Sequence, residues 1–185
     1  MIKKLLSKKK NANGSISLDN YPRLLEPGEY GPDFSLRAVT GRGDSEKMVS
    51  LGDLRGKSVV LVFYPKDGTA VCGSQLALYN EALELLEEQK AHIVAISVDS
   101  LDTHLSFAKS LDLAFPLLSD DNPAGAVASA YGVFNEDDGL SERALFVLDG
   151  RGIVRWRYIS PRGINPGMDG ILSALESLDS TGNRS

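Results

Sequence analysis

The chain has 185 residues, which is the size of one domain and long enough to bury a hydrophobic core. Hydrophobic residues make up 42% and charged residues 24%, an ordinary composition for a globular protein. The formal net charge of −5 argues against a nucleic-acid-binding function, because binding to phosphates usually needs an excess of Lys and Arg.

The two ends of the chain are predicted to be tails around one domain. We expect a basic and polar tail over residues 1–24, a domain over residues 25–179 and a short polar tail over residues 180–185. The first ten residues are basic, but no apolar run follows them, so they do not match a secretory signal. No segment has the apolar length of a membrane-spanning helix, and a single cysteine fits a reducing compartment, so we expect a cytoplasmic protein.

The first half of the domain is predicted to alternate strands with a helix. Two short strands joined by a turn-rich segment are expected at residues 34–37 and 48–51. The β-branched and aromatic run over residues 58–64 is typical of a strand buried on both faces. A helix over about residues 72–89 follows, because four apolar residues recur at helical spacing: Leu76, Tyr79, Leu83 and Leu86.

The second half continues this alternation and then changes to a hairpin. A second buried strand is predicted over residues 91–98, and a helix follows through about residue 111, with Asp99, Ser100 and Asp102 as candidate N-caps. A short extended segment (115–120) and a helix that ends at glycine (123–132) come next. Strands over residues 143–149 and 152–158 form a hairpin, and a last helix covers about residues 166–178.

This order of elements predicts a thioredoxin-like α/β fold, with a central mixed sheet flanked by helices. The strand–helix alternation supplies parallel central strands, and the hairpin supplies antiparallel ones. The order alone also permits a flavodoxin-like fold, so the functional site has to decide between the two.

Cys72 is the only cysteine in the sequence, which excludes an intrachain disulfide and a metal site built from several cysteines. It follows a buried strand and the loop at residues 65–69, at the start of a predicted helix. The free N–H groups and the dipole of a helix N-terminus favour the thiolate, which is the reactive form of cysteine. The alternative is a small buried hydrophobic residue, and position alone leaves both interpretations open. The two histidines, His92 and His104, lie in no ligand-spaced motif, and we interpret them as structural or surface residues.

The segment PKDGTAVC, from Pro65 to Cys72, resembles the P-x-x-x-T-x-x-C motif of peroxiredoxins. The downstream segments FPLLSD and AYGV resemble further landmarks of that family, and the resemblance extends over about residues 28–178. Arg143 falls where the family keeps an active-site arginine, and Gln75 matches a position that holds Glu or Gln. The segment YGVFNE is most similar to the alkyl hydroperoxide reductase E subgroup of one-cysteine peroxiredoxins, near the bacterioferritin comigratory protein branch.

The resemblance implies a role for each of these residues. Cys72 is the peroxidatic nucleophile, which attacks a hydroperoxide and becomes a sulfenic acid. Thr69 caps the helix and hydrogen-bonds the thiolate and the peroxide, and Arg143 stabilises the thiolate and the charge on the breaking O–O bond. Pro65 completes the pocket, and Gln75 orients Arg143. The resemblance implies no cofactor and no metal.

The sequence also departs from the family pattern. Ala70 and Gly73 replace a proline and a threonine that are frequent there, and neither change removes a functional group. Ala77 stands where the bacterioferritin comigratory protein branch commonly has a resolving cysteine. The resemblance therefore implies an external thiol reductant, either a thioredoxin-like or glutaredoxin-like protein or a small thiol. The family often forms homodimers, and we expect neither nucleic acid nor membrane as a partner.

Three other functions could use a cysteine at this position. A thiol–disulfide oxidoreductase needs C-x-x-C, and Thr69 occupies the place of its first cysteine. The presence of all four motif residues argues against an inactive structural relative: Pro65, Thr69, Cys72 and Arg143. A peroxide-sensing switch or binding module without significant turnover stays open, because it needs the same reactive thiolate as an enzyme.

Overall fold

Six consecutive buried residues form β3 (Ser58–Phe63), the strand around which the sheet is built. The computed structural model describes residues 23–43 and 45–181, and its main sheet has seven strands in the order β2-β1-β5-β4-β3-β8-β9. β3, β4 (Ala91–Ser97) and β5 (Leu117–Ser119) run parallel. The antiparallel pairs lie outside them: β8 (Arg143–Leu148) with β9 (Val154–Ser160), and β1 (Ser35–Val39) with β2 (Lys47–Ser50). These antiparallel strands exclude the flavodoxin-like alternative, whose sheet is parallel.

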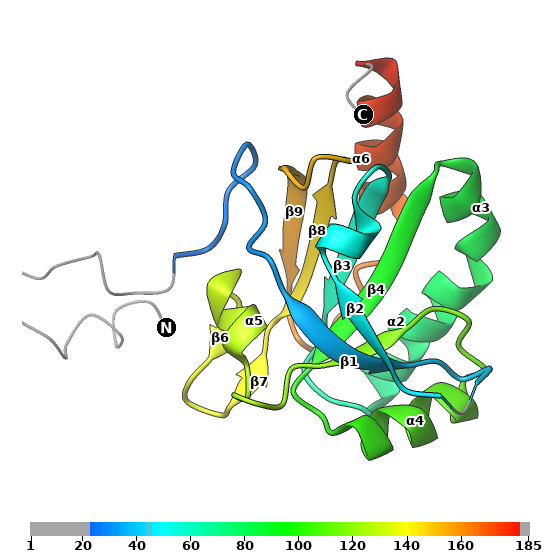
Figure 1. Ribbon diagram of the computed structural model, residues 1–185, viewed down its shortest axis with the longest axis vertical. Helices are drawn as coiled ribbons and strands as arrows, with labels where there is room; N and C mark the ends of the chain where they lie inside the picture. The colour runs from blue at the N-terminus through cyan, green and yellow to red at the C-terminus, as the bar shows by residue number, and fades with distance from the viewer. Residues whose placement is uncertain (1–22, 44, 182–185) are drawn as a thin grey trace, which may run out of the picture.

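Helices cover both faces of this sheet, because alternate side chains of β3 enter two different cores. Val60 and Val62 pack toward four helices: α2 (Ala70–Glu81), α3 (Leu83–Glu88), α4 (Leu101–Ser110) and α6 (Asp169–Ser180). Val59, Leu61 and Phe63 pack toward α5 (Ala126–Ala130). Figure 1 shows α5 and the small sheet of β6 (Phe134–Asn135) and β7 (Leu140–Ser141) on one side, with α2, α3 and α4 on the other. A short 3-10 turn, η2 (Gly52–Leu54), follows β2.

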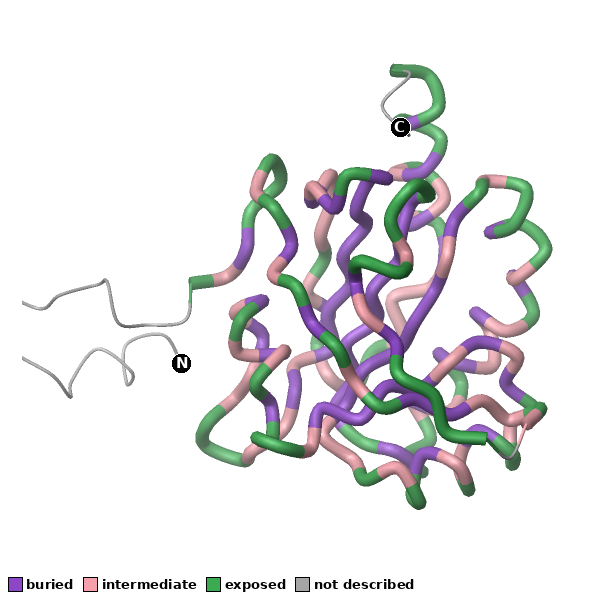
Figure 2. Tube along the Cα trace, viewed as in Figure 1, coloured by how far each residue is buried: buried purple, intermediate pink, exposed green. Residues whose placement is uncertain are grey.

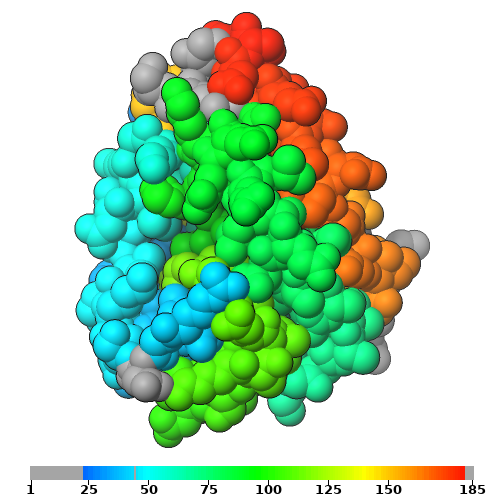
Figure 3. Space-filling view, turned by 90° about the vertical axis from the view of Figure 1, so that its right-hand side faces the viewer, coloured from blue at the N-terminus to red at the C-terminus, as the bar shows by residue number. Residues whose placement is uncertain are grey.

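The distribution of burial follows the predicted amphipathic pattern. Figure 2 shows the central strands as mostly buried and the outer helices as alternately buried and exposed. Of the four apolar residues used to predict the first helix, Leu76, Tyr79 and Leu86 are buried, and Leu83 packs against the same core. Figure 3 looks onto the helical side, where α6 lies beside the green segments that include α2 and α3.

Two predicted helices differ from the observed ones. The helix predicted over residues 72–89 bends at Ala82, which separates α2 from α3 while its N–H still donates to the Leu78 carbonyl. The helix predicted over residues 123–132 is reduced to α5. Gly125 precedes it in a left-handed conformation (φ 74°), and a Cβ there would lie 2.1 Å from the ring of Phe134. This close approach needs glycine, and it places the start of the helix after residue 125.

The other predicted elements are confirmed within one to three residues at their ends. Ser100 is the observed N-cap of α4, and its hydroxyl accepts a hydrogen bond from the Thr103 N–H. The N-terminal tail predicted over residues 1–24 lies almost entirely outside the described residues. Within the described part of the chain, no helix has the length and apolar character needed to span a membrane.

Candidate active site

Cys72 lies in the first turn of α2, directly after the loop that leaves the carboxyl end of β3. Thr69 caps this helix with extended backbone angles (φ −85°, ψ 149°), and its hydroxyl oxygen accepts a hydrogen bond from the Cys72 N–H at 3.4 Å. The Thr69 hydroxyl in turn donates to the Lys66 carbonyl. Thr69 and Ala70 are exposed, whereas Cys72 is 0% exposed, so the thiol lies just beneath the surface at a helix N-terminus.

Arg143 reaches the sulfur from the neighbouring strand. β8 runs antiparallel to β3, with Phe63 paired to Ala144, so the first residue of β8 lies beside the end of β3 where the Cys72 loop begins. The guanidinium is buried, with 2% of the residue exposed, and its Nη2 donates to Cys72 Sγ at 3.3 Å. The sheet topology thus brings together two residues that are 71 positions apart in the sequence.

Neutral groups fix the orientation of the Arg143 guanidinium. Nη1 donates to Gln75 Oε1 at 2.5 Å, while Nε and Nη2 donate to the Arg162 carbonyl at 3.0 and 2.7 Å. Gln75 donates to the Tyr79 hydroxyl, which donates to the Gly167 carbonyl. Burial raises the pKa of Tyr79 to about 12, so at neutral pH its hydroxyl keeps the proton that it donates. This chain of bonds connects α2, β8 and the segment before α6.

Ion pairs hold the backbone at Arg162, whose carbonyl accepts the hydrogen bonds of Arg143. The Arg162 side chain pairs with Asp138 and, at 3.0 Å, with Glu142. Its bond with Asp138 lowers the pKa of that carboxyl and raises the pKa of Arg162. These contacts attach the β6–β7 region to the loop after β9, and so they restrict the Arg162 carbonyl.

The structure brings together most of the residues singled out from the sequence. Cys72, Gln75 and Arg143 are in one hydrogen-bonded cluster, with Thr69 on the Cys72 N–H. Pro65 is buried in the loop between β3 and α2. The bond expected from the Thr69 hydroxyl to the thiolate stays a prediction.

Sequence reasoning missed several supporting residues. Tyr79 lies four residues after Gln75, so helical spacing was a usable signal for their contact. Arg162 acts through its backbone carbonyl, for which the sequence carries no signal. Asp67 and His104 form a buried pair beside the loop, and a hydrophobic pattern does not indicate such a pair. Over residues 23–43 and 45–181, no cluster of three or more His, Cys, Asp and Glu side chains has the placement of metal ligands.

Comparison with known proteins establishes the family. A model described as the AhpC/TSA family matches residues 27–157, which is more than half of the chain. The chain belongs to the AhpC/TSA family. Alkyl hydroperoxide reductase E of Mycobacterium tuberculosis is 39% identical to this peroxiredoxin over 141 residues, covering 76% of this chain and 89% of that protein. Thioredoxin peroxidase of Fasciola hepatica is 31% identical over 163 residues, covering 84% and 81% of the two chains.

Solved structures confirm the fold. The crystal structure of reduced 2-Cys peroxiredoxin from Plasmodium vivax superposes with a TM-score of 0.77 and 30% identity, covering 84% of this chain and 83% of that one. The thioredoxin-like prediction, in its peroxiredoxin variant, is therefore confirmed. With one cysteine in its sequence, this peroxiredoxin is of the one-cysteine type.

Proposed function

We propose that this peroxiredoxin is a thiol-dependent peroxidase that reduces hydrogen peroxide and organic hydroperoxides at Cys72. The observation that carries the proposal is the contact between the buried Arg143 guanidinium and Cys72 Sγ at a helix N-terminus. Both features favour the thiolate, which is the nucleophilic form.

The oxidation step uses the thiolate as nucleophile. The sulfur attacks the terminal oxygen of ROOH, an S–O bond forms, and the O–O bond breaks with its electron pair going to the alkoxide. The sulfur is oxidised by two electrons to sulfenic acid, and the alkoxide takes a proton from solvent to leave as ROH. Arg143 stabilises the charge that spreads over the breaking bond, and Thr69 and Pro65 orient the peroxide. Gln75 acts by orienting Arg143.

Regeneration uses thiols from outside this chain. A first thiol condenses with the sulfenic acid to give a mixed disulfide and water, and a second thiol releases Cys72 and forms an external disulfide. We assign this reductant to the class of thioredoxin-like or glutaredoxin-like proteins and small thiols. The name of the Fasciola hepatica relative, thioredoxin peroxidase, supports the first of these.

The setting of this reaction is also part of the proposal. A single free cysteine is suited to a reducing compartment, so we place the protein in the cytoplasm. We further propose a homodimer, as is frequent in the family. Analytical ultracentrifugation at micromolar concentration tests the dimer, and a sedimenting species of 19.9 kDa alone would contradict it.

Stopped-flow mixing of the reduced protein with hydrogen peroxide or an organic hydroperoxide tests the function. We expect fast, stoichiometric oxidation of Cys72, visible by mass spectrometry as one added oxygen, and no such product in Cys72→Ser. Oxidation no faster than that of free cysteine under the same conditions would refute the peroxidase. Multiple turnovers with one member of a reductant panel then identify an enzyme, whereas a single turnover with all of them would indicate a sensor.

A further inference from the structure

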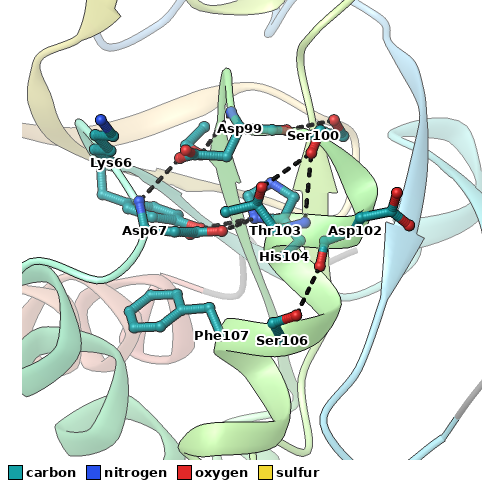
Figure 4. A network of polar contacts seen from close by, with 12 residues as sticks. Lys66, Asp67, Asp99, Ser100, Asp102, Thr103, His104, Ser106 and Phe107 are labelled. Atoms are coloured by element: carbon teal, nitrogen blue, oxygen red, sulfur yellow. Dashed lines mark hydrogen bonds and ion pairs between the residues drawn. The ribbon is translucent and has the colours of Figure 1, made fainter.

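The loop that carries the peroxidatic motif is tied down by the side chain of Asp67, midway between Pro65 and Thr69. This carboxylate is 2% exposed. Its Oδ1 accepts a hydrogen bond from the Tyr64 hydroxyl at 2.6 Å, and its Oδ2 lies 2.7 Å from His104 Nδ1. The Asp67 N–H donates to Asp99 Oδ2 at 2.9 Å (Figure 4). Both the backbone and the side chain of the loop's central residue are therefore fixed to other elements.

His104 supplies the other half of this buried contact. It belongs to α4 and is 0% exposed, and its Nε2 lies 3.1 Å from the Leu118 carbonyl oxygen of β5. A carbonyl oxygen only accepts hydrogen bonds, so Nε2 carries a hydrogen. Nδ1 also lies 3.3 Å from the Tyr64 hydroxyl oxygen, but that hydroxyl donates to Asp67 Oδ1 at 2.6 Å, so a neutral imidazole would present a bare Nδ1 lone pair to the carboxylate of Asp67. The separation of 2.7 Å is that of a strong hydrogen bond, so a proton lies between Nδ1 and Oδ2.

The surroundings place this proton on the imidazole. The Tyr64 hydroxyl donates to Oδ1 and so stabilises the charged carboxylate, and burial raises the pKa of Tyr64 well above its ordinary value, which keeps it a donor. Asp99 is engaged by the Ser97 hydroxyl and the Asp67 N–H. The exposed Lys66 and Asp102 point away from the ring in Figure 4. A buried charge needs a close partner of opposite sign, and His104 and Asp67 provide this for each other.

We propose that Asp67 and His104 form a buried carboxylate–imidazolium pair that positions the peroxidatic loop. The pair fastens the loop to α4 and, through Leu118, to β5, and so it holds the Thr69 cap and the first turn of α2 against Arg143. Among the hydrogen bonds of the described residues, Cys72 Sγ is bonded to Arg143 and to neither side chain of the pair, so both are positioning residues. This inference rests on the proposed function of Cys72, but the protonation state of the pair does not.

The chemistry of the pair provides a matched set of variants. Asp67→Asn keeps an oxygen for the Tyr64 hydroxyl and offers an N–H to a neutral Nδ1, so it fastens the loop without the shared proton. His104→Gln retains an amide that reaches the Leu118 carbonyl but removes the contact at Asp67 Oδ2. His104→Asn places an N–H near the former Nδ1 and restores the contact with Asp67. Asp102→Asn, in the same helix but facing outward, is the control.

The experiment measures single-turnover oxidation of Cys72 by hydrogen peroxide in the full chain, together with ¹⁵N NMR of the histidine ring. We expect a rate at least tenfold lower in His104→Gln, and rates within threefold of wild type in Asp67→Asn, His104→Asn and the control. The NMR spectrum should show both ring nitrogens of His104 protonated in wild type and only Nε2 protonated in Asp67→Asn. If His104→Gln does not fold, the uncharged double variant Asp67→Asn/His104→Gln replaces it, with the same expected loss.

Two results would overturn the proposal. One is a wild-type rate in folded His104→Gln or in the folded double variant, both of which break the contact between residues 67 and 104; the pair would then be a stabilising contact with no effect on the loop. The other is an unprotonated Nδ1 in the wild-type protein. If wild-type Cys72 itself reacts no faster than free cysteine, the proposed function fails, while the NMR spectra still decide whether the charged pair exists.

Discussion

Replacing Arg143 by alanine tests the electrostatic basis of the site. Nη2 lies 3.3 Å from Cys72 Sγ, and at an effective dielectric constant of about 20 the attraction between two unit charges at that distance is about 5 kcal/mol. This value is an upper limit, because water and neighbouring dipoles replace part of the lost interaction. Removal of one preorganised donor from a developing anion typically costs about 2.7–4 kcal/mol, or about 10²–10³ in rate. We therefore expect Arg143→Ala to oxidise about 100 to 1,000 times more slowly than wild type.

The assay is the second-order rate constant for oxidation of Cys72 by hydrogen peroxide in stopped flow. Arg143→Lys keeps the charge but cannot serve Cys72, Gln75 and the Arg162 carbonyl together, so its rate should be intermediate. Arg157→Ala removes an arginine of β9 that pairs with Glu26 at the surface, and it should react as wild type does. A folded Arg143→Ala that reacts within threefold of wild type would refute the argument.

Three further predictions concern the residues that surround and support Cys72 and Arg143. Gln75→Leu, which removes the acceptor for Arg143, should lower the oxidation rate about tenfold, from the loss of about 1.5 kcal/mol in a charge-assisted hydrogen bond, whereas Gln75→Glu should retain it. Thr69→Val should reduce the free energy of unfolding by about 1 kcal/mol in urea titrations, because the α2 cap is lost, and Thr69→Ser should not. The lowered pKa of Asp138 contributes stability above the ordinary value of 3.8, and this contribution is lost as pH falls below it. Asp138→Asn should therefore show a smaller decrease in melting temperature between pH 6 and pH 3 than wild type, and an equal decrease would contradict the ion pair.

The fold could be predicted where a local pattern determines it. β3 and β4 are uninterrupted apolar runs, and the β8–β9 hairpin has a glycine turn between two strand-like segments. The pattern failed where a distant contact decides the structure. The start of α5 depends on the packing of Gly125 against the Phe134 ring, nine residues further along the chain. The bend at Ala82 keeps the hydrogen bonds from the Ala82 N–H to the Leu78 carbonyl and from the Leu86 N–H to the Ala82 carbonyl, and it keeps the apolar spacing, so a periodic pattern does not reveal it.

For the candidate site, the sequence indicated the central side chains but not the groups that hold them in place. The family motif and the helix-start position singled out Cys72, Thr69 and Arg143 as candidates, and the structure brings these three residues together. The sequence could not indicate the Arg162 carbonyl, because every residue has a backbone carbonyl. Only the tertiary structure determines which carbonyl accepts the hydrogen bonds of Arg143. His104 was interpreted as structural or surface, and the fold places it in the interior, in contact with the motif loop.

The partners of Arg143 also favour one of the two interpretations of Cys72 that the sequence left open. A guanidinium is never deprotonated in a protein, and a buried one needs a compensating negative charge. Among the hydrogen bonds that Arg143 makes within the described residues, the partners are an amide oxygen, a backbone carbonyl and the sulfur of Cys72. Only the sulfur can become an anion. A cysteine serving as a small hydrophobic residue would leave this buried cation uncompensated, so the position of Arg143 favours a thiolate at Cys72 and with it the reactive form.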